Sequence, residues 1–338
     1  MVVSVNPTYR SPFLDVPGAV EAAEPDTGVA AHYGDPHREQ RQLVAGTGVV
    51  DLSHRDVVRV SGPDRLTWLH QLTTQHFERL PAGEATSALV LDPNGRVEHA
   101  LYGVDDGETI WFHMEPGSAA PLVQYLDSMK FWSQVEVADV TGEVCVVWEP
   151  TGSVTGDEGG PAVIVARVTE RGRDVFVRRA ELRSYVDSVG SLAGIWAYEA
   201  LRIEAHEARH GRETDERTIP HEVGWIGAAV HLDKGCYRGQ ETVARVHTLG
   251  RPPRRMVMLH LDGSVDYLPE HGEDVVADGR TVGFVGSSAR HHELGPIALA
   301  VVKRNVPTDV PLTAGGVAAS QEVVVDPEAG LHVRPKLR

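Results

Sequence analysis

The most informative segment of the chain is Lys234-Gly235-Cys236-Tyr237-Arg238-Gly239-Gln240-Glu241. Two glycines bracket its cysteine, and Lys234 and Arg238 each stand two positions from Cys236. Cations close to a cysteine favour the reactive thiolate when the loop is partly exposed. The segment therefore predicts a functional thiol at Cys236. The alternative is a tight loop in which this cysteine is only a small buried hydrophobe.

These eight residues resemble the signature of the YgfZ family, Lys-Gly-Cys-Tyr-x-Gly-Gln-Glu. Members of that family are folate-binding relatives of the glycine-cleavage T-protein and are implicated in iron–sulfur cluster synthesis or repair. The resemblance extends over most of the chain after about His37. It also rests on Asp51-Leu52-Ser53 with Val60-x-Gly62-x-Asp64, on Ala200-Leu201-Arg202-Ile203-Glu204, on Ile219-Pro220-His221-Glu222, and on a barrel-like tail.

The resemblance and the residue pattern together predict an α+β protein with three parts. Residues 1–36 are rich in Pro, Gly, Ala and acidic residues without apolar periodicity, which is typical of a loosely ordered leader. The resemblance implies a T-protein-like folate-binding body over residues 37–248. Beyond a polar, proline-containing joint at residues 251–254, short alternating segments separated by Gly and Pro fit a C-terminal β-barrel over residues 251–338.

Composition limits the classes of binding partner and the cellular compartment that we expect for this protein. The formal net charge of −16 would repel phosphate backbones and anionic headgroups, so general nucleic-acid or membrane-surface binding is disfavoured. The two cysteines, Cys145 and Cys236, stand in different contexts, which argues against a disulfide scaffold; Cys145, between valines, is expected to be inert core. No apolar run approaches the roughly 18–20 residues of a membrane span, and the first residues lack the order of a signal peptide. We expect a cytoplasmic protein.

Glu204 is the candidate for binding the pterin of a reduced folate, as the resemblance implies. A pterin presents an N–H beside an exocyclic amine, and one carboxylate can accept both hydrogen bonds as a charge-assisted pair. The alternative is a solvated glutamate near a helix end. Lys234, Arg238 and Arg245 are candidates for the glutamyl carboxylates of folate, because an acidic protein needs local cations to hold a polyanion. Their alternative is plain surface solvation.

A hairpin is predicted by the turn Asp92-Pro93-Asn94-Gly95 between the apolar runs 87–91 and 97–104. T-protein-like transferases carry a functional aspartate just after this hairpin. The matching position here is His99, or Glu98 if the alignment slips by one residue. An imidazole cannot supply the same fixed negative charge beside a developing iminium. We therefore expect aminomethyl transfer to be absent.

A competing motif, H-E-x-x-H, occurs at His206-Glu207-Ala208-Arg209-His210 and would bind zinc if it lay on one helix face. Gly211 tends to end such a helix, and no third ligand follows at the usual spacing, so a metalloprotease is not favoured. His291-His292-Glu293 is expected to be a polar turn, with a weak metal site as the alternative. We predict no bound metal.

The resulting hypothesis is a tetrahydrofolate-binding accessory protein for iron–sulfur proteins, without aminomethyl-transfer activity. One cysteine cannot complete the four-thiolate shell of a stable cluster, so contact with iron–sulfur clients through Cys236 is expected to be transient. Two alternatives stay open: a folate-dependent aminomethyltransferase or demethylase, and a folate storage or sensing module in which Cys236 has no role.

Overall fold

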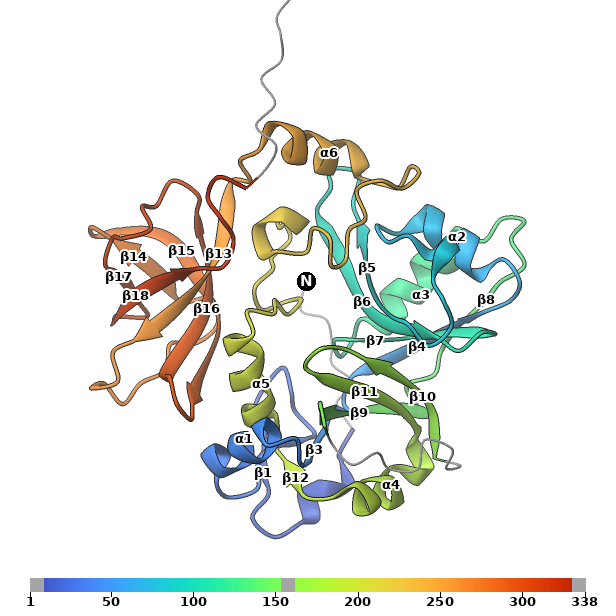
Figure 1. Cartoon of the computed structure of the whole chain (residues 1–338), viewed down its shortest axis with the longest axis horizontal. Coiled ribbons are helices and arrows are strands. Elements are labelled where there is room, and N and C mark those ends of the chain that lie inside the picture. Colours follow the sequence, from blue (N-terminus) through green and yellow to red (C-terminus); the bar gives the residue numbers. More distant parts are fainter. Residues whose placement is uncertain (1–8, 153–161, 330–338) are drawn as a thin grey trace, which may run out of the picture. The chain divides into compact units, whose positions relative to one another are not determined.

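The computed structural model describes residues 9–152 and 162–329. The chain divides into two compact units, and their helices and strands are labelled in Figure 1. Of the described residues, one unit contains those up to His70, His76–Ser87 and those from Leu101 to Tyr198; the other contains Gln71–Gln75, Ala88–Ala100 and those from Glu199 onward. Helices and mainly antiparallel sheets occur together, which confirms the predicted α+β class.

The first unit contains a five-stranded sheet in the order β10-β11-β9-β3-β12. Every residue of β9 is buried: its run Val144–Trp148 is apolar on both faces of the sheet, and the buried carboxylate of Glu149 pairs with Arg173 at 2.7 Å. Helix α4 packs Leu182, Tyr185 and Val186 into the same cluster as Cys145. The elements are β10 (Val163–Val168), β11 (Gly172–Arg178), β9 (Val144–Pro150), β3 (Val49–Asp51), β12 (Leu192–Ala193), α1 (Pro36–Val44), η3 (Arg179–Glu181) and α4 (Leu182–Val189).

A second five-stranded sheet has the order β5-β6-β7-β4-β8. It contains the predicted hairpin, whose turn is closed by the Asp92 carboxylate accepting from the backbone N–H groups of Asn94 at 2.7 Å and Arg96 at 2.8 Å. Gly95 takes the positive φ of +79° that this turn needs. The elements are β5 (Ala85–Leu91), β6 (Val97–Asp105), β7 (Thr109–Met114), β4 (Asp56–Ser61), β8 (Glu136–Asp139), α2 (Arg65–Leu72), η2 (Phe77–Arg79) and α3 (Ala119–Ser128).

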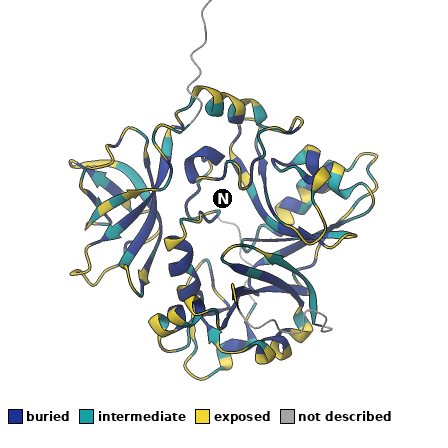
Figure 2. Ribbon diagram, in the orientation of Figure 1, coloured by how far each residue is buried: buried dark blue, intermediate teal, exposed yellow. Residues whose placement is uncertain are grey.

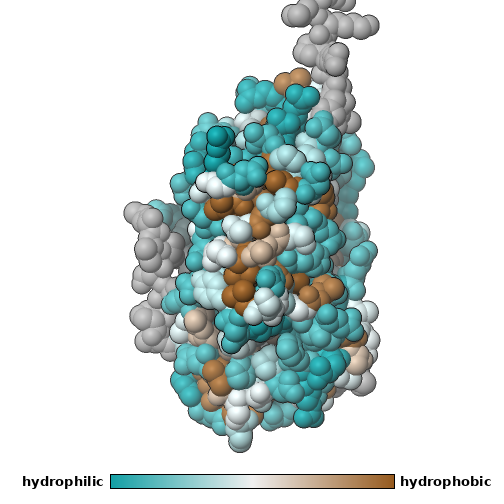
Figure 3. All heavy atoms as spheres, turned by 90° about the vertical axis from the view of Figure 1, so that its left-hand side faces the viewer, coloured by the Kyte–Doolittle hydropathy of each residue, from teal (hydrophilic) through white to brown (hydrophobic). Residues whose placement is uncertain are grey.

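The second unit contains a closed barrel in the order β13-β16-β15-β14-β17-β18, which confirms the predicted C-terminal barrel. Alternate apolar residues such as Val257, Leu259 and Ala300 fill its interior. The strands are β13 (Arg254–Leu261), β14 (Asp274–Ala277), β15 (Arg280–His291), β16 (Gly295–Lys303), β17 (Leu312–Ala314) and β18 (Val317–Val323). In the view of Figure 3 the surface is mostly hydrophilic, with hydrophobic residues gathered in the middle of the face.

Three further elements carry or support the predicted site residues: α5 (Ile195–Glu204), η4 (Pro220–Val223) and α6 (Gln240–Leu249). Buried residues concentrate along the strands and the inner sides of the helices, whereas turns and outer helix faces are exposed (Figure 2). None of the helices in the described part of the chain is long and apolar enough to cross a membrane.

The loosely ordered leader expected over residues 1–36 is not what the structure shows for residues 9–36. This segment holds η1 (Pro12–Asp15) and a ribbon of β1 (Val20–Glu21) and β2 (Ala30–His32). Phe13 is 1% exposed and packs against the cluster around Val49 and Cys145, while Ser11 donates a hydrogen bond to Asp51. One buried aromatic anchors a segment whose overall composition is typical of disorder. Residues 1–8 lie outside the described part.

Candidate functional site

Lys234 fastens the loop that carries Cys236. Its side chain is buried, and its ammonium donates to the carbonyl oxygens of Thr73 at 2.6 Å and Gln75 at 2.9 Å. The ammonium also lies 5.1 Å from the centre of the Tyr237 ring. Lys234 was expected to bind the glutamyl carboxylates of folate, but the structure directs its charge to backbone carbonyls. Its evident role is therefore to hold the loop.

The two cysteines lie in opposite environments. Cys236 is an exposed free cysteine on the loop, whereas Cys145 is fully buried in β9. Burial raises the pKa of the Cys145 thiol to about 12, because a thiolate would lose its hydration there. Burial likewise raises the pKa of Tyr237 to about 12. The loop thus presents its thiol to solvent while it buries the neighbouring aromatic ring.

Gly239 allows the loop to approach the β5–β6 hairpin closely. It has a φ of +81°, and a Cβ added to it would lie 2.5 Å from the carbonyl oxygen of Asp92. The neighbouring Arg238 forms a bidentate ion pair with Glu98, with N–O distances of 3.0 and 3.2 Å. Gly239 precedes the first residue of α6, and its backbone carbonyl accepts from the Val243 N–H. The second half of the signature is thus shaped by contact with the hairpin.

The remaining signature residues have mixed environments. Gln240 begins α6, and its side-chain amide lies 3.5 Å from the carbonyl oxygen of Lys234. Gly235 and Glu241 are exposed. Arg245 is exposed one turn further along α6. Of the three cations predicted to bind the folate carboxylates, Arg245 is therefore the one that lies outside the signature loop, on helix α6.

Glu204 is the last residue of α5, and a buried histidine holds its carboxylate. Nε2 of His291 lies 3.2 Å from Oε2 of Glu204; the His291 side chain is fully buried, whereas that of Glu204 is 46% exposed. Nδ1 of His291 accepts from the backbone N–H groups of Glu293 at 3.2 Å and Leu294 at 3.1 Å, which assigns the proton to Nε2. Burial lowers the pKa of His291, so the ring donates to Glu204 as a neutral imidazole.

Arg202 positions the end of the same helix. It is buried, pairs with Glu199 at 2.8 Å and Glu213 at 3.1 Å, and donates to the Ser287 hydroxyl at 2.6 Å. The arginine of the Ala200–Glu204 segment therefore fixes the helix, and the glutamate two residues later is left half-exposed. Sequence reasoning missed both His291 and Arg202 as positioning residues. The only signal for His291 was the pair His291-His292, which we interpreted as a polar turn.

His99 and Glu98 are the two hairpin positions at which we expected the counterpart of a transferase aspartate. His99 lies on β6, and burial, reinforced by nearby His210, lowers the pKa of His99 to about 4. It is therefore neutral near pH 7. Glu98, the alternative position, is occupied by its ion pair with Arg238. Neither residue presents an uncommitted negative charge.

The H-E-x-x-H motif does not form a zinc site of the helical type. Residues 206–210 follow α5 without helical structure, and His206 has a φ of +58°. Its Nε2 lies 3.2 Å from the Met258 sulfur, whereas His210 lies near His99. The two imidazoles therefore do not share one helix face.

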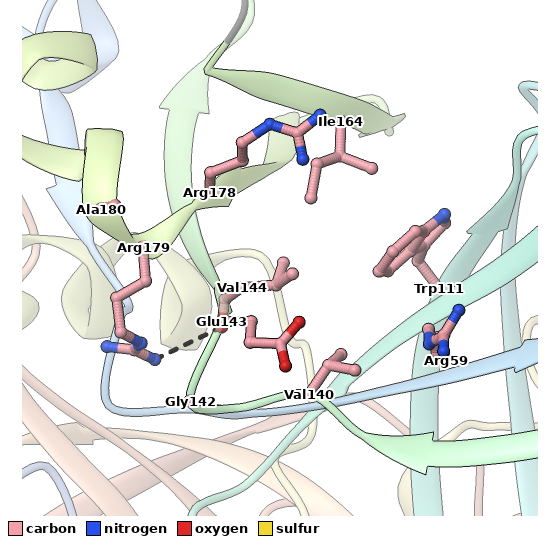
Figure 4. A pocket seen from close by; sticks show the side chains of 10 residues that line it. All are labelled: Arg59, Trp111, Val140, Gly142, Glu143, Val144, Ile164, Arg178, Arg179 and Ala180. Atoms are coloured by element: carbon pink, nitrogen blue, oxygen red, sulfur yellow. Dashed lines mark hydrogen bonds between the residues drawn. The ribbon is translucent and has the colours of Figure 1, made fainter.

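A separate pocket of about 800 Å³ lies in the first unit (Figure 4). Arg59, Arg178 and Glu143 supply charged groups, while Trp111 and Ile164 form part of an apolar wall. Arg179, also in the lining, donates to backbone carbonyls. None of the predicted site residues lines this pocket, so it gives no support to the folate site.

Comparisons with known proteins agree with this architecture. The chain matches the GCVT N-terminal domain over residues 29–148 and the glycine cleavage T-protein C-terminal barrel domain over residues 254–333. An aminomethyltransferase from Rubrobacter xylanophilus is 30% identical over 301 residues, covering 80% of each chain. A chloroplastic transferase-like protein from Arabidopsis thaliana is 26% identical, covering 83% of this chain and 71% of that protein. The crystal structure of the glycine cleavage system aminomethyltransferase T from Bartonella henselae has the same fold, with a TM-score of 0.77 and 18% identity over 94% of this chain and 97% of that chain.

Proposed function

Because the chain belongs to the glycine-cleavage T-protein family, we propose that it binds a reduced folate, such as tetrahydrofolate, through Glu204. One observation carries the proposal: the Glu204 carboxylate is half-exposed while buried His291 holds one of its oxygens. A carboxylate has about four lone-pair sites, so it can accept from His291 and still accept the N–H and amine of a pterin. His291 would act as a positioning residue that orients the carboxylate before the ligand arrives.

Calorimetric titration with tetrahydrofolate tests this role of Glu204. Loss of a charge-assisted contact should cost about 1.5–3 kcal/mol, so Glu204→Ala should weaken binding roughly tenfold to hundredfold. Glu216→Ala, an exposed glutamate in the same unit, is the matched control and should bind like the wild type. Equal affinity of the Glu204→Ala variant and the wild type would remove Glu204 from the site.

The glutamyl end of the folate needs a cation, and Arg245 is the best candidate for it. Lys234 is bound to backbone carbonyls, and Arg238 is paired with Glu98. Arg245→Gln should therefore weaken the binding of a polyglutamylated folate more than the binding of a folate with a single glutamate. An equal loss of affinity for the two ligands would show that the glutamyl tail binds elsewhere.

We propose further that the protein does not transfer aminomethyl groups. Neutral His99 and paired Glu98 leave no uncommitted negative charge at the hairpin to stabilise an iminium. The alternative, an aminomethyltransferase, is favoured by the relatives that carry that name. Ammonia release from an aminomethyl-loaded lipoyl carrier with tetrahydrofolate separates the two: we expect none above background, and turnover of about 1 per second or more would favour the transferase.

The cellular role that we propose is support of iron–sulfur proteins through Cys236. An exposed thiol on a loop whose base is fastened by Lys234 can meet a labile cluster or an oxidised cysteine of a client in transient contact. Cells carrying Cys236→Ala should lose iron–sulfur enzyme activity under oxidative stress, while the purified variant keeps its folate affinity. If such cells retain full activity and a deletion strain loses it, the thiol is dispensable and folate storage or sensing becomes the better account.

A further inference from the structure

Three side chains in the first unit form a group that the folate site does not use. His70 lies near the end of α2, His76 directly precedes η2, and Glu78 lies within η2. One potential ligand atom from each residue lies within 4.8 Å of the other two. The two imidazole rings are 4.6 Å apart between centroids and inclined by 74°. His70 is buried, His76 is half-buried and Glu78 is exposed, so the group opens to solvent on one side.

From this geometry we infer that His70, His76 and Glu78 bind a divalent transition-metal ion, for which zinc is the natural probe. Two imidazole nitrogens and one carboxylate form a ligand set that suits zinc and leaves a fourth position for water. Zinc–ligand bonds of about 2.0–2.1 Å place tetrahedral ligand atoms about 3.3 Å apart. The three ligand atoms lie within 4.8 Å of one another, so binding requires an approach of at most about 1.5 Å between any two of them. The alternative is simple packing of two imidazoles beside a solvated glutamate.

One feature of His76 favours the metal site over simple packing. His76 stands at the N-cap position of η2, yet its side chain makes no capping hydrogen bond. Serine, threonine, asparagine and aspartate are the usual caps, so capping does not account for a histidine here.

A metal bound to His70 and His76 would also connect the two ends of the segment Gln71–Gln75. Gln71–Gln75, which joins His70 to His76, contains the carbonyls of Thr73 and Gln75 that accept from the Lys234 ammonium. The Thr74 hydroxyl donates to the Ala229 carbonyl at 2.6 Å, so the segment is fixed at several points. A metal joining residues on both sides of the segment would restrict it further. The inferred role is thus a structural clip that supports the anchor of the Cys236 loop.

Zinc titration of the untagged, full-length protein after chelator treatment tests the inference. We expect one zinc ion per chain, and His76→Ala and Glu78→Gln should each weaken binding at least tenfold, because even outer-shell partners of metal ligands contribute that much. Both residues lie at least partly exposed, so the fold should survive, which circular dichroism checks. His37→Ala, an exposed histidine elsewhere in this unit, is the control and should bind like the wild type.

Two further readouts identify the site directly. Cobalt substitution should give the visible absorption of a tetrahedral site in the wild type and not in the His76→Ala variant. Zinc should slow hydrogen exchange over Gln71–Gln75 in the wild type alone. The inference fails if the wild type takes up no zinc, if His76→Ala binds zinc with wild-type affinity, or if His210→Ala abolishes binding instead.

Discussion

Replacing Lys234 with methionine should destabilise the protein by about 3 kcal/mol. The substitution retains most of the apolar stem and removes the ammonium, which donates to the Thr73 carbonyl at 2.6 Å and to the Gln75 carbonyl at 2.9 Å. A hydrogen bond to a charged group contributes about 1.5–3 kcal/mol. We take the lower figure for both bonds because the contact to Gln75 is partly exposed.

Urea unfolding followed by circular dichroism measures this effect, and Arg245→Met supplies the comparison. Arg245 is an exposed cation on α6, and exposed substitutions usually change stability by less than about 0.5 kcal/mol. If the Lys234→Met and Arg245→Met variants are equally stable, the Lys234 contacts do not hold the loop and the reasoning is refuted.

Three other outcomes are expected. In the folded protein at neutral pH, iodoacetamide should alkylate exposed Cys236 well before buried Cys145, whose pKa is raised to about 12, as peptide mass spectrometry would show. Gly239→Ala should destabilise the protein by about 1–3 kcal/mol in urea unfolding, because its φ of +81° and the Asp92 carbonyl 2.5 Å from the added Cβ both oppose a side chain. The unfolded chain should protonate His99 before the folded protein does, because folding lowers its pKa from 6.5 to about 4; stability should therefore fall as pH drops through this window, and fall less in His99→Gln.

A specific result would contradict each of these three predictions. Equal labelling of the two cysteines would mean that β9 opens readily or that the Cys236 loop is protected. A Gly239→Ala variant as stable as the wild type would mean that the hairpin does not approach the loop closely. Identical pH profiles for the wild type and His99→Gln would show that the imidazole is not desolvated in the folded state.

The barrel could be predicted from sequence because its signals are local. Short strands separated by Gly and Pro indicate a barrel, and in β13 every second residue, Val257, Leu259 and Leu261, belongs to the barrel core, although Met258, between Val257 and Leu259, is buried as well. The β5–β6 hairpin could also be predicted from sequence, because the hydrogen bonds that form the turn at Asp92–Gly95 join residues close together in the chain. Helix α6 was missed because Val243 is its only buried residue, which leaves almost no apolar periodicity to detect.

The partners of the candidate site could not be predicted in the same way. Glu204 and His291 are separated by 87 residues, and only the folded second unit shows that one orients the other. Lys234 looked like a ligand-binding cation because sequence does not reveal that the Thr73 and Gln75 carbonyls surround its ammonium. The Pro- and Gly-rich composition before residue 37 likewise concealed the burial of Phe13. Charge and composition indicate candidate residues, but long-range packing decides which of them stay available.

A crystal structure of the protein with tetrahydrofolate tests the central claim most directly. We predict that the pterin N–H and amine lie about 2.7–3.1 Å from the carboxylate oxygens of Glu204, with His291 still donating to that carboxylate. A pterin bound away from Glu204, for example in the pocket lined by Arg59 and Trp111, would contradict the account.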